Sequence, residues 1–371
     1  MPYIKSSYSV PFGKIAMSLI DMAVEVGRKV IEDSNRKPDA VIIGSMLAEE
    51  LYGIQNIASK VVDSLGIYGI PSFKMDTASS TGALLVHEAV YRLYSNSFSN
   101  ILVIGAEKMN IADTRKVTTV LSHVLSDNEQ KHGATMPSMA ALIAKHYMRL
   151  YNAPYEAFAH VAIKNHHNAT LNPISHLKKE ITLEDVLSSK FIAEPLRLYD
   201  CAPISDGATA MMISKEKSDV EIIGIGQSTD NVNLLDRNFI DGFYSTQMAS
   251  RRAFEMAGIN VKEIDIAEIH DAFTPFEIIG MEDIGISRKG EGWKDVMEGK
   301  TSLEGEIPVN TSGGLKARGH PVSVSGLAQI EEIYLQLSNK AGKRQVDSRI
   351  GIAQSIGGLA TNNFVTILRR V

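Results

Sequence analysis

The chain has 371 residues, 44% of them hydrophobic, and carries 38 Lys and Arg against 43 Asp and Glu, for a formal net charge of -5. This composition is typical of a globular protein with about two or three structural units, and its weakly acidic balance argues against a general binder of nucleic acid or anionic membranes. A single cysteine, Cys201, excludes an intrachain disulfide framework and a cysteine-rich metal site.

The two ends of the sequence carry no recognisable targeting signal. Residues 1–17 lack an apolar core of signal-peptide length, and the final residues Leu-Arg-Arg-Val match no lipidation signal. No apolar run approaches the roughly 20 residues that a membrane span needs. We therefore expect a cytoplasmic protein without a membrane span.

Short runs of β-branched residues alternate with longer helical patterns along the chain. Buried strands are predicted at 40–44, 101–105, 208–213, 221–226, 265–269, 349–353 and 363–368. Helices are predicted at 82–94, at 247–257 ahead of a C-capping Gly258, and after Thr182, which forms a capping-box pattern with Asp185. Strands that alternate with helices indicate α/β layers.

Residues 108–200 differ from the rest, because they are rich in Met, His and Asn and poor in strand signals. We expect a mostly helical insertion there. On either side of it, residues 79–84 and 323–328 share a pattern in which Gly82 and Gly326 correspond and a helix leads on to a strand. This predicts two similar halves whose loops face one cleft. Chance similarity between two α/β segments is the alternative.

The segment NTSGGLKARGHPVSVSG at 310–326 is the richest in chemical signals. Its glycines expose the backbone, and His320 is held in a turn between Gly319 and Pro321. There the histidine could approach a ligand as a general base, which we favour. A phosphate-cradling or purely structural loop is the alternative.

Three other segments also stand where α/β proteins build their sites. His270 and Asp271 follow a predicted strand, where the histidine could donate to a carbonyl oxygen and the aspartate could orient a loop. Residues 76–82 lead into a helix whose dipole favours a nucleophile, although an ordinary N-cap is the alternative. Residues 352–359 run from a strand into glycines whose N–H groups could form an oxyanion hole.

Nucleotide and metal motifs are not found. The glycines after 224 lack the third glycine of a dinucleotide fingerprint, and His166 and His167 are adjacent, so they do not share a helical face as metal-binding pairs do. We expect no metal and no cofactor.

Taken in order, these segments resemble the thiolase superfamily, especially its archaeal and sterol-carrier-protein-type acetyl-CoA acetyltransferases. The resemblance spans nearly the whole chain, through VPFGK at 10–14, GAEKM at 105–109, KNHHNA at 164–169, PLRLYDCAPISDGATA at 195–210, HDAF at 270–273 and GGLKARGHP at 313–321. It implies a five-layer αβαβα core of two similar halves, 1–107 with 201–218 and 219–371, and a loop domain inserted at 108–200.

The resemblance also implies a reaction on coenzyme A thioesters. A nucleophile takes an acyl group from acyl-CoA, and a second acetyl-CoA is deprotonated and condensed onto it, or the reverse. By position, His320 resembles the histidine that activates the nucleophile, and His270 the histidine that completes the hole for the enolate. Gly357 resembles the glycine whose N–H serves the second hole, and with Gly314 and Gly358 it is expected to bind substrate.

Two serines stand at the positions of the family's catalytic cysteines. Ser79 replaces the nucleophile and Ser355 the second cysteine, and both are predicted site residues. A serine hydroxyl is a weaker nucleophile than a thiolate, and its oxygen ester lies downhill of a thioester, so return of the acyl group to coenzyme A is unfavourable. The one thiol, Cys201, is expected to lie away from the site.

We therefore expect an acyltransferase that resembles acetyl-CoA C-acetyltransferase and is impaired in thiolysis. One alternative is a non-catalytic homologue that binds acyl-CoA or scaffolds a partner enzyme of isoprenoid or lipid metabolism. Another is an acyl-CoA hydrolase or acyltransferase that depends on Ser79. The resemblance further implies a homodimer or homotetramer, acyl-CoA as the small-molecule partner, and no nucleic-acid partner.

Overall fold

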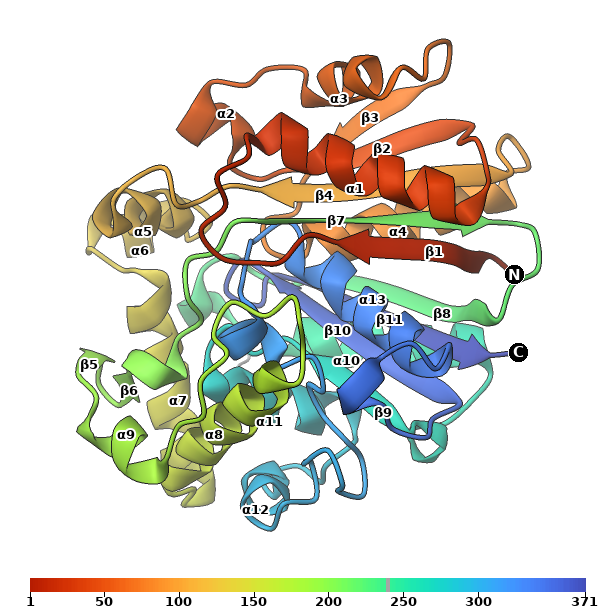
Figure 1. Ribbon diagram of the computed structural model, residues 1–371. Coiled ribbons are helices and arrows are strands. Elements are labelled where there is room, and N and C mark those ends of the chain that lie inside the picture. The colour runs from red at the N-terminus through yellow and green to blue at the C-terminus, as the bar shows by residue number, and fades with distance from the viewer. Residues whose placement is uncertain (238–240) are drawn as a thin grey trace.

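The computed structural model describes residues 1–237 and 241–371, and these form one mixed sheet with helices on both faces (Figure 1). The strands run in the order β3 (Ser72–Met75), β2 (Ala40–Gly44), β4 (Asn100–Glu107), β7 (Gly207–Ser214), β1 (Tyr3–Ser9), β8 (Val220–Thr229), β11 (Asn362–Arg370), β10 (Ile350–Gly357) and β9 (Ile266–Ile269). The pairs β3–β2, β2–β4 and β10–β9 are parallel, and the other neighbours are antiparallel.

All the predicted strands are present, although several begin or end a few residues away from the predicted positions. The sequence predicts no strand at β1 or β3. In β1 the residues Tyr-Ile-Lys-Ser-Ser-Tyr-Ser include no continuous apolar run, and β3 is a short strand at the edge of the sheet. Both signals are too weak for prediction from periodicity.

The pairing between strands is shortest at the centre of the sheet, where β1 and β8 pair only through Tyr3 with Glu221 and Ile4 with Val220. Helices α4 (Thr81–Tyr94) and α13 (Ser325–Leu337) lie between the two halves and share one apolar core with both. Helices α1 (Leu19–Ser34) and α3 (Ile57–Leu65) cover the outer face of the first half, and α10 (Tyr244–Ala257) and α11 (Thr274–Ile284) that of the second. This is the five-layer arrangement that the resemblance implies.

Helices α4 and α13 touch where the predicted repeat places its two glycines. A Cβ atom on Gly82 would overlap the backbone nitrogen of Leu327, and one on Gly326 would lie 2.8 Å from the nitrogen of Ala83. Neither position has room for a side chain. The two helices therefore begin side by side, and the loops that precede them meet.

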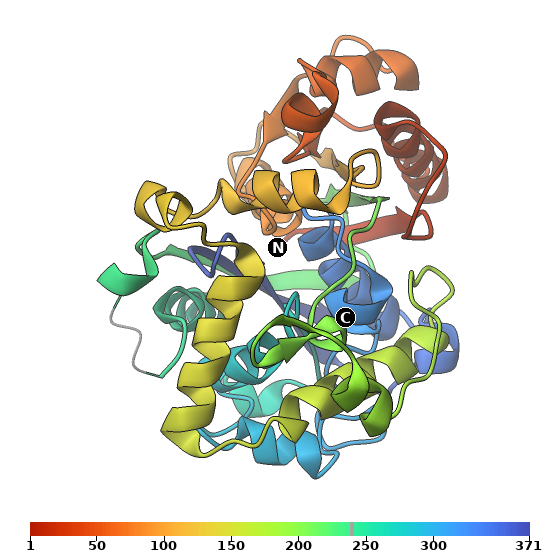
Figure 2. The ribbon, with the colours of Figure 1, turned by 90° about the vertical axis from the view of Figure 1, so that its left-hand side faces the viewer.

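The insertion between β4 and β7 is mostly helical, as predicted. It contains α5 (Thr114–Ser122), α6 (Asp127–Lys131), α7 (Met136–Tyr151), α8 (Glu156–Thr170), α9 (Leu183–Ser188) and a small hairpin of β5 (Phe191–Ala193) and β6 (Leu196–Arg197). The predicted capping box of Thr182 and Asp185 begins α9. Figure 2 shows the insertion lying against the second half, where α8 packs on η4 (Gly314–Arg318) and α12 (Gly292–Met297). The exact domain boundaries stay a prediction.

The remaining helical elements are short. They are α2 (Ala48–Tyr52), η1 (Leu198–Asp200), η2 (Leu234–Asp236), η3 (Val261–Glu263) and η5 (Gly342–Arg344). Within the described ranges, no helix has the length and apolar character to cross a membrane.

We expect Gly82→Ala to lower the free energy of unfolding by about 2–3 kcal/mol, because the added methyl group meets backbone that does not yield. Gly27→Ala in α1 is the matched control, since its Cβ would meet only side-chain ends, Ile104 Cδ1 at 3.0 Å and Leu65 Cδ1 at 3.3 Å. The control is expected to change stability by less than about 1 kcal/mol. Urea unfolding of both variants measures the difference, and equal stabilities would contradict the backbone contact.

Candidate active site

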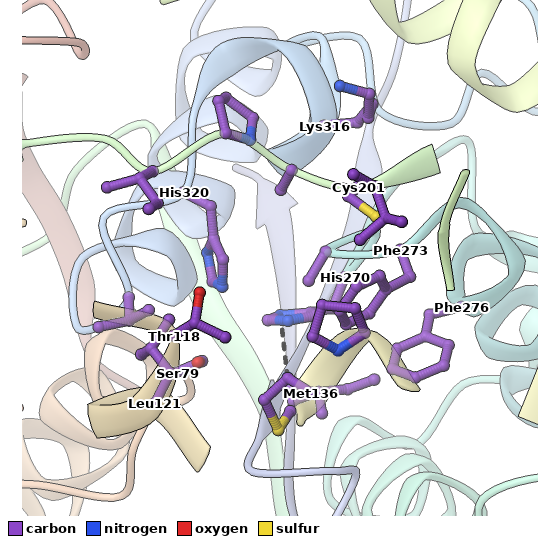
Figure 3. A pocket seen from close by; sticks show the side chains of 18 of the residues that line it. Ser79, Thr118, Leu121, Met136, Cys201, His270, Phe273, Phe276, Lys316 and His320 are labelled. Atoms are coloured by element: carbon purple, nitrogen blue, oxygen red, sulfur yellow. Dashed lines mark hydrogen bonds between the residues drawn. The ribbon is translucent and has the colours of Figure 1, made fainter. Parts of the chain in front are cut away.

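A cavity of about 570 Å³ lies where the insertion meets the loops of both halves (Figure 3). Most of its lining is apolar, and α5, α7, η1, residues 201–204 and the loop after β9 all contribute to it. Its lining includes four of the predicted site residues, Ser79, His270, His320 and Gly358. Among the described residues that line it there is no carboxylate, so the cavity is suited to groups on which negative charge develops.

Ser79 lies in a tight turn directly before α4. Ala78 adopts a left-handed conformation with φ 55°, and the turn is held by the Thr77 N–H, which donates to Thr81 Oγ1 at 2.9 Å, and by the Ser80 hydroxyl, which donates to the Thr77 carbonyl at 2.9 Å. None of the described residues hydrogen-bonds the Ser79 hydroxyl, and this side chain lines the cavity. The turn thus presents the hydroxyl at a helix N-terminus, as expected for a nucleophile.

His320 is held through its Nδ1 atom. This atom lies 2.7 Å from Ser325 Oγ, and the Ser325 hydroxyl donates to the Pro321 carbonyl at 3.0 Å. Because the hydroxyl has one proton, both contacts form when Nδ1 donates to Ser325, which leaves an unprotonated Nε2. Burial, with a smaller effect of the nearby Arg318 cation, lowers the pKa of His320 to about 3. The ring is therefore a neutral base.

His270 has the opposite tautomer. The Ile356 N–H donates to its Nδ1 at 3.2 Å, so the proton of the neutral ring sits on Nε2. Burial lowers the pKa of His270 well below its usual value, and electrostatic repulsion, first between the two imidazoles if both took up a proton and then from the Arg318 cation, adds to this effect. The two rings are perpendicular, with centroids 5.4 Å apart. One cavity therefore contains a histidine that can accept a proton and another that can donate a hydrogen bond.

Asp271 orients the glycine-rich loop, as the sequence suggests. Its carboxylate accepts the Leu315 N–H at 2.6 Å, the Lys316 N–H at 3.2 Å and the Asn165 side-chain amide at 2.7 Å. Gly314 makes this approach possible, since a Cβ atom there would overlap the carboxylate. Gly314 therefore contacts Asp271 and lies outside the cavity lining.

Ser355 and Gly357 also lie outside the lining. Ser355 is buried, its hydroxyl has no hydrogen-bond partner within the described chain, and it lies 2.6 Å from where a Cβ of Gly326 would be. Its neighbour Ile356 lines the cavity, and successive side chains of a strand point to opposite faces. Gly357 packs tightly on Thr77. The predicted catalytic role of Ser355 and the substrate-binding roles of Gly314 and Gly357 stay predictions.

The expectation that Cys201 lies away from the site is wrong, because Cys201 lines the same cavity. The chain returns from the insertion across both histidine loops: the Ala202 N–H donates to the Ala272 carbonyl at 2.9 Å, and Ile204 pairs with His320. Burial and the Asp200 charge raise the pKa of Cys201 to about 12, so it is a neutral thiol. Nothing in the local sequence shows where this side chain points.

Lys316 is a second lining residue that the sequence does not single out. It belongs to the glycine-rich segment around His320, and that membership is the signal that could have drawn attention to it. The direction of its side chain depends on how its turn is held, and Asp271 holds this turn by accepting the Lys316 N–H.

Comparison with known proteins agrees with this architecture. A family model described as thiolase, N-terminal domain, matches residues 3–217, and one described as thiolase C-terminal domain-like matches 226–370. The acetyl-CoA acetyltransferase of Methanothermobacter thermautotrophicus is 36% identical over 97% of each chain, and that of Methanocaldococcus jannaschii 35% over 96% of each. Bovine sterol carrier protein 2 is 31% identical over 91% of this chain and 66% of its own length.

Two solved structures share the fold. An Ltp2-ChsH2(DUF35) aldolase superposes with a TM-score of 0.86 at 21% identity, over 100% of this chain and 97% of that one. A monomeric SCP2-thiolase-like protein type 1 from Mycobacterium smegmatis superposes with a TM-score of 0.75 at 16% identity, over 99% of this chain and 77% of that one.

We expect His270 and His320 to stay neutral between about pH 5 and pH 8, whereas histidines of the urea-unfolded chain titrate near 6.5. Carbon-13 NMR of the imidazole rings, assigned with His270→Asn and His320→Asn, measures this. Since only the unfolded chain gains the protons, the stability contributed by a neutral His320 is complete above about pH 6.5 and is lost as the pH falls towards 3. A ring that titrates near 6.5 in the folded protein would contradict the assignment.

Proposed function

The chain belongs to the thiolase family, and on that basis we propose that it is an acetyl-CoA C-acetyltransferase-like enzyme acting on coenzyme A thioesters. The observation that carries the proposal is the pairing of His320, with a free Nε2, and His270, with a protonated Nε2, in the cavity that contains Ser79. A base, a hydrogen-bond donor and a hydroxyl are the groups that acyl transfer needs.

In the first step, the Ser79 hydroxyl attacks the thioester carbonyl and His320 Nε2 accepts its proton. The bond between the carbonyl carbon and sulfur breaks, and the departing thiolate takes that proton from His320, which leaves an acyl ester on Ser79 and free coenzyme A. Ser79 and His320 are not hydrogen-bonded in this structure, so their contact forms with the substrate in place.

In the second step, an acetyl-CoA loses a proton from its methyl carbon and the enolate attacks the acyl ester. His270 donates from Nε2 to the enolate oxygen. Because Ser355 lies outside the lining, we assign the proton removal to His320, which is unprotonated again once the first coenzyme A has left. Ser79 leaves as its alkoxide and recovers the proton from His320, so the cycle returns to its starting state.

A Ser79-dependent acyl-CoA hydrolase or acyltransferase is the second candidate. The position of Ser355 favours it, because hydrolysis of an acyl ester needs only water and one base, and His320 supplies that base. If no turnover is found, the result would support the third candidate, a non-catalytic homologue that binds acyl-CoA or acts as a scaffold.

The proposal extends to the setting of the enzyme. The names of its relatives, acetyl-CoA acetyltransferase and sterol carrier protein 2, support a role in lipid metabolism. From the sequence and its resemblance we further propose the mevalonate pathway, the cytoplasm, a homodimer or homotetramer, and a partner enzyme of isoprenoid or lipid metabolism.

The test is loss of acetoacetyl-CoA in the presence of coenzyme A. We expect slow turnover by the natural chain, none above background by His320→Ala, and at least a tenfold gain by Ser79→Cys, because a thiolate is the better nucleophile and its thioester returns the acyl group readily. Ser188→Cys, on an exposed position of α9, controls for the added thiol. No gain by Ser79→Cys over Ser188→Cys would contradict the assignment of Ser79.

Mass spectrometry separates the two enzymatic candidates. Incubation with acetyl-CoA is expected to leave one acetyl group on the peptide that contains Ser79, and Ser79→Ala is expected to leave none. Release of free acetate with no acetoacetyl-CoA would favour the hydrolase, whereas the absence of any adduct and any product would leave only the binding homologue.

A further inference from the structure

Lys316 is a buried cation on the wall of the cavity. Its side chain is 2% exposed and comes from the turn η4, whose backbone is tied to Asp271. Figure 3 shows it beyond Cys201, across the pocket from Ser79. The mechanism above does not use it.

The Lys316 ammonium has no counter-ion in the described parts of the chain. No carboxylate of these parts lies within 4.0 Å of its Nζ, and the ring centroid of Tyr199 is 6.0 Å away. Three other cations of the interior are ion-paired: Lys164 lies 3.1 Å from Glu277, Arg318 3.5 Å from Glu268 and Arg344 2.8 Å from Glu332. Buried Arg237 has no carboxylate partner, but its guanidinium donates to the Asn231 carbonyl at 2.6 Å and to Thr361 Oγ1 at 3.1 Å, whereas no acceptor within the described chain takes a hydrogen bond from the Lys316 ammonium.

The two carboxylates that influence Lys316 are occupied by other donors. Asp271 accepts two backbone N–H groups and an amide. Asp200 accepts the Thr274 hydroxyl at 2.8 Å, the Tyr155 hydroxyl at 2.7 Å and the Arg197 N–H at 2.7 Å. Neither carboxylate turns an oxygen to the ammonium, which keeps its three donors for a ligand.

An unpaired buried ammonium is costly, so a partner is expected to enter with the substrate. Burial lowers the pKa of Lys316 to about 8, and the group is therefore still largely protonated at neutral pH. An anion that binds to this ammonium replaces an unpaired charge with an ion pair. The cavity, at about 570 Å³, holds an acyl group much larger than acetyl.

We propose that Lys316 binds a carboxylate at the far end of the acyl group, so that this site prefers an ω-carboxyacyl thioester of coenzyme A. The inference rests on the proposed function, because it places the thioester carbon at Ser79. The phosphates of coenzyme A are an unsuitable partner, since they carry several charges that need water and Lys316 is almost completely buried.

The test compares binding of glutaryl-CoA with that of pentanoyl-CoA, its neutral counterpart in chain length, by calorimetry on Ser79→Ala, which does not turn over. We expect glutaryl-CoA to bind at least tenfold more tightly. Lys316→Met in this background is expected to remove the preference and Lys316→Arg to keep part of it. Lys190→Met, an exposed position with the same loss of charge, controls for long-range attraction.

Three outcomes would overturn the proposal that Lys316 binds the terminal carboxylate. Equal affinity of the two thioesters would do so, as would equal weakening of both thioesters and of coenzyme A by Lys316→Met, which would place Lys316 against the pantetheine arm. Binding of no thioester at all would overturn the proposed function as well. Thioester binding without a preference for glutaryl-CoA would overturn only the role of Lys316.

A stability measurement is independent of substrate. Since Lys316→Met removes an unpaired buried charge and keeps the side-chain volume, we expect the Tm to rise by a few degrees. A fall of several degrees would show that Lys316 is paired within the protein, and this too would overturn the inference.

Discussion

Helices α4 and α13 meet at Gly82 and Gly326, where the backbone of one helix touches that of the other with no side chain between them. The rest of the site depends on this contact. Ser79 directly precedes α4, and His320 precedes α13 and is held by its first residue, Ser325. A methyl group at either glycine would push the two helices apart and so shift the hydroxyl and the imidazole relative to each other.

The chemistry of the cavity depends on two histidines that carry no charge. Burial keeps His270 and His320 neutral, and their hydrogen bonds to Ile356 and Ser325 select opposite tautomers. A neutral base and a neutral donor can then act without first exchanging protons with water. Lys316 is the exception, a cation on the same wall, and its lack of a partner is what distinguishes it from the structural ion pairs of the core.

The serine at position 79 affects the chemistry of the site more than its geometry. The turn, the helix N-terminus and the two histidines would serve a thiolate equally well, and nothing in the geometry is adjusted to a hydroxyl. The position of Ser355, on the face of β10 away from the cavity, leaves His320 as the available base for both steps. Condensation therefore uses the same base a second time, after acyl transfer to Ser79.

The sequence by itself determined the layered α/β fold, most strands and the histidine loops, because these signals are local. Continuous apolar runs such as β2 and β4 belong to strands buried on both faces, and glycines beside His320 mark a turn wherever the chain goes. Only the tertiary structure decided that Cys201 and Lys316 line the cavity and that Ser355 does not. The direction of a side chain in an irregular loop depends on contacts made with residues far away in sequence, here Ala272 and Asp271, and no periodicity in the loop encodes them.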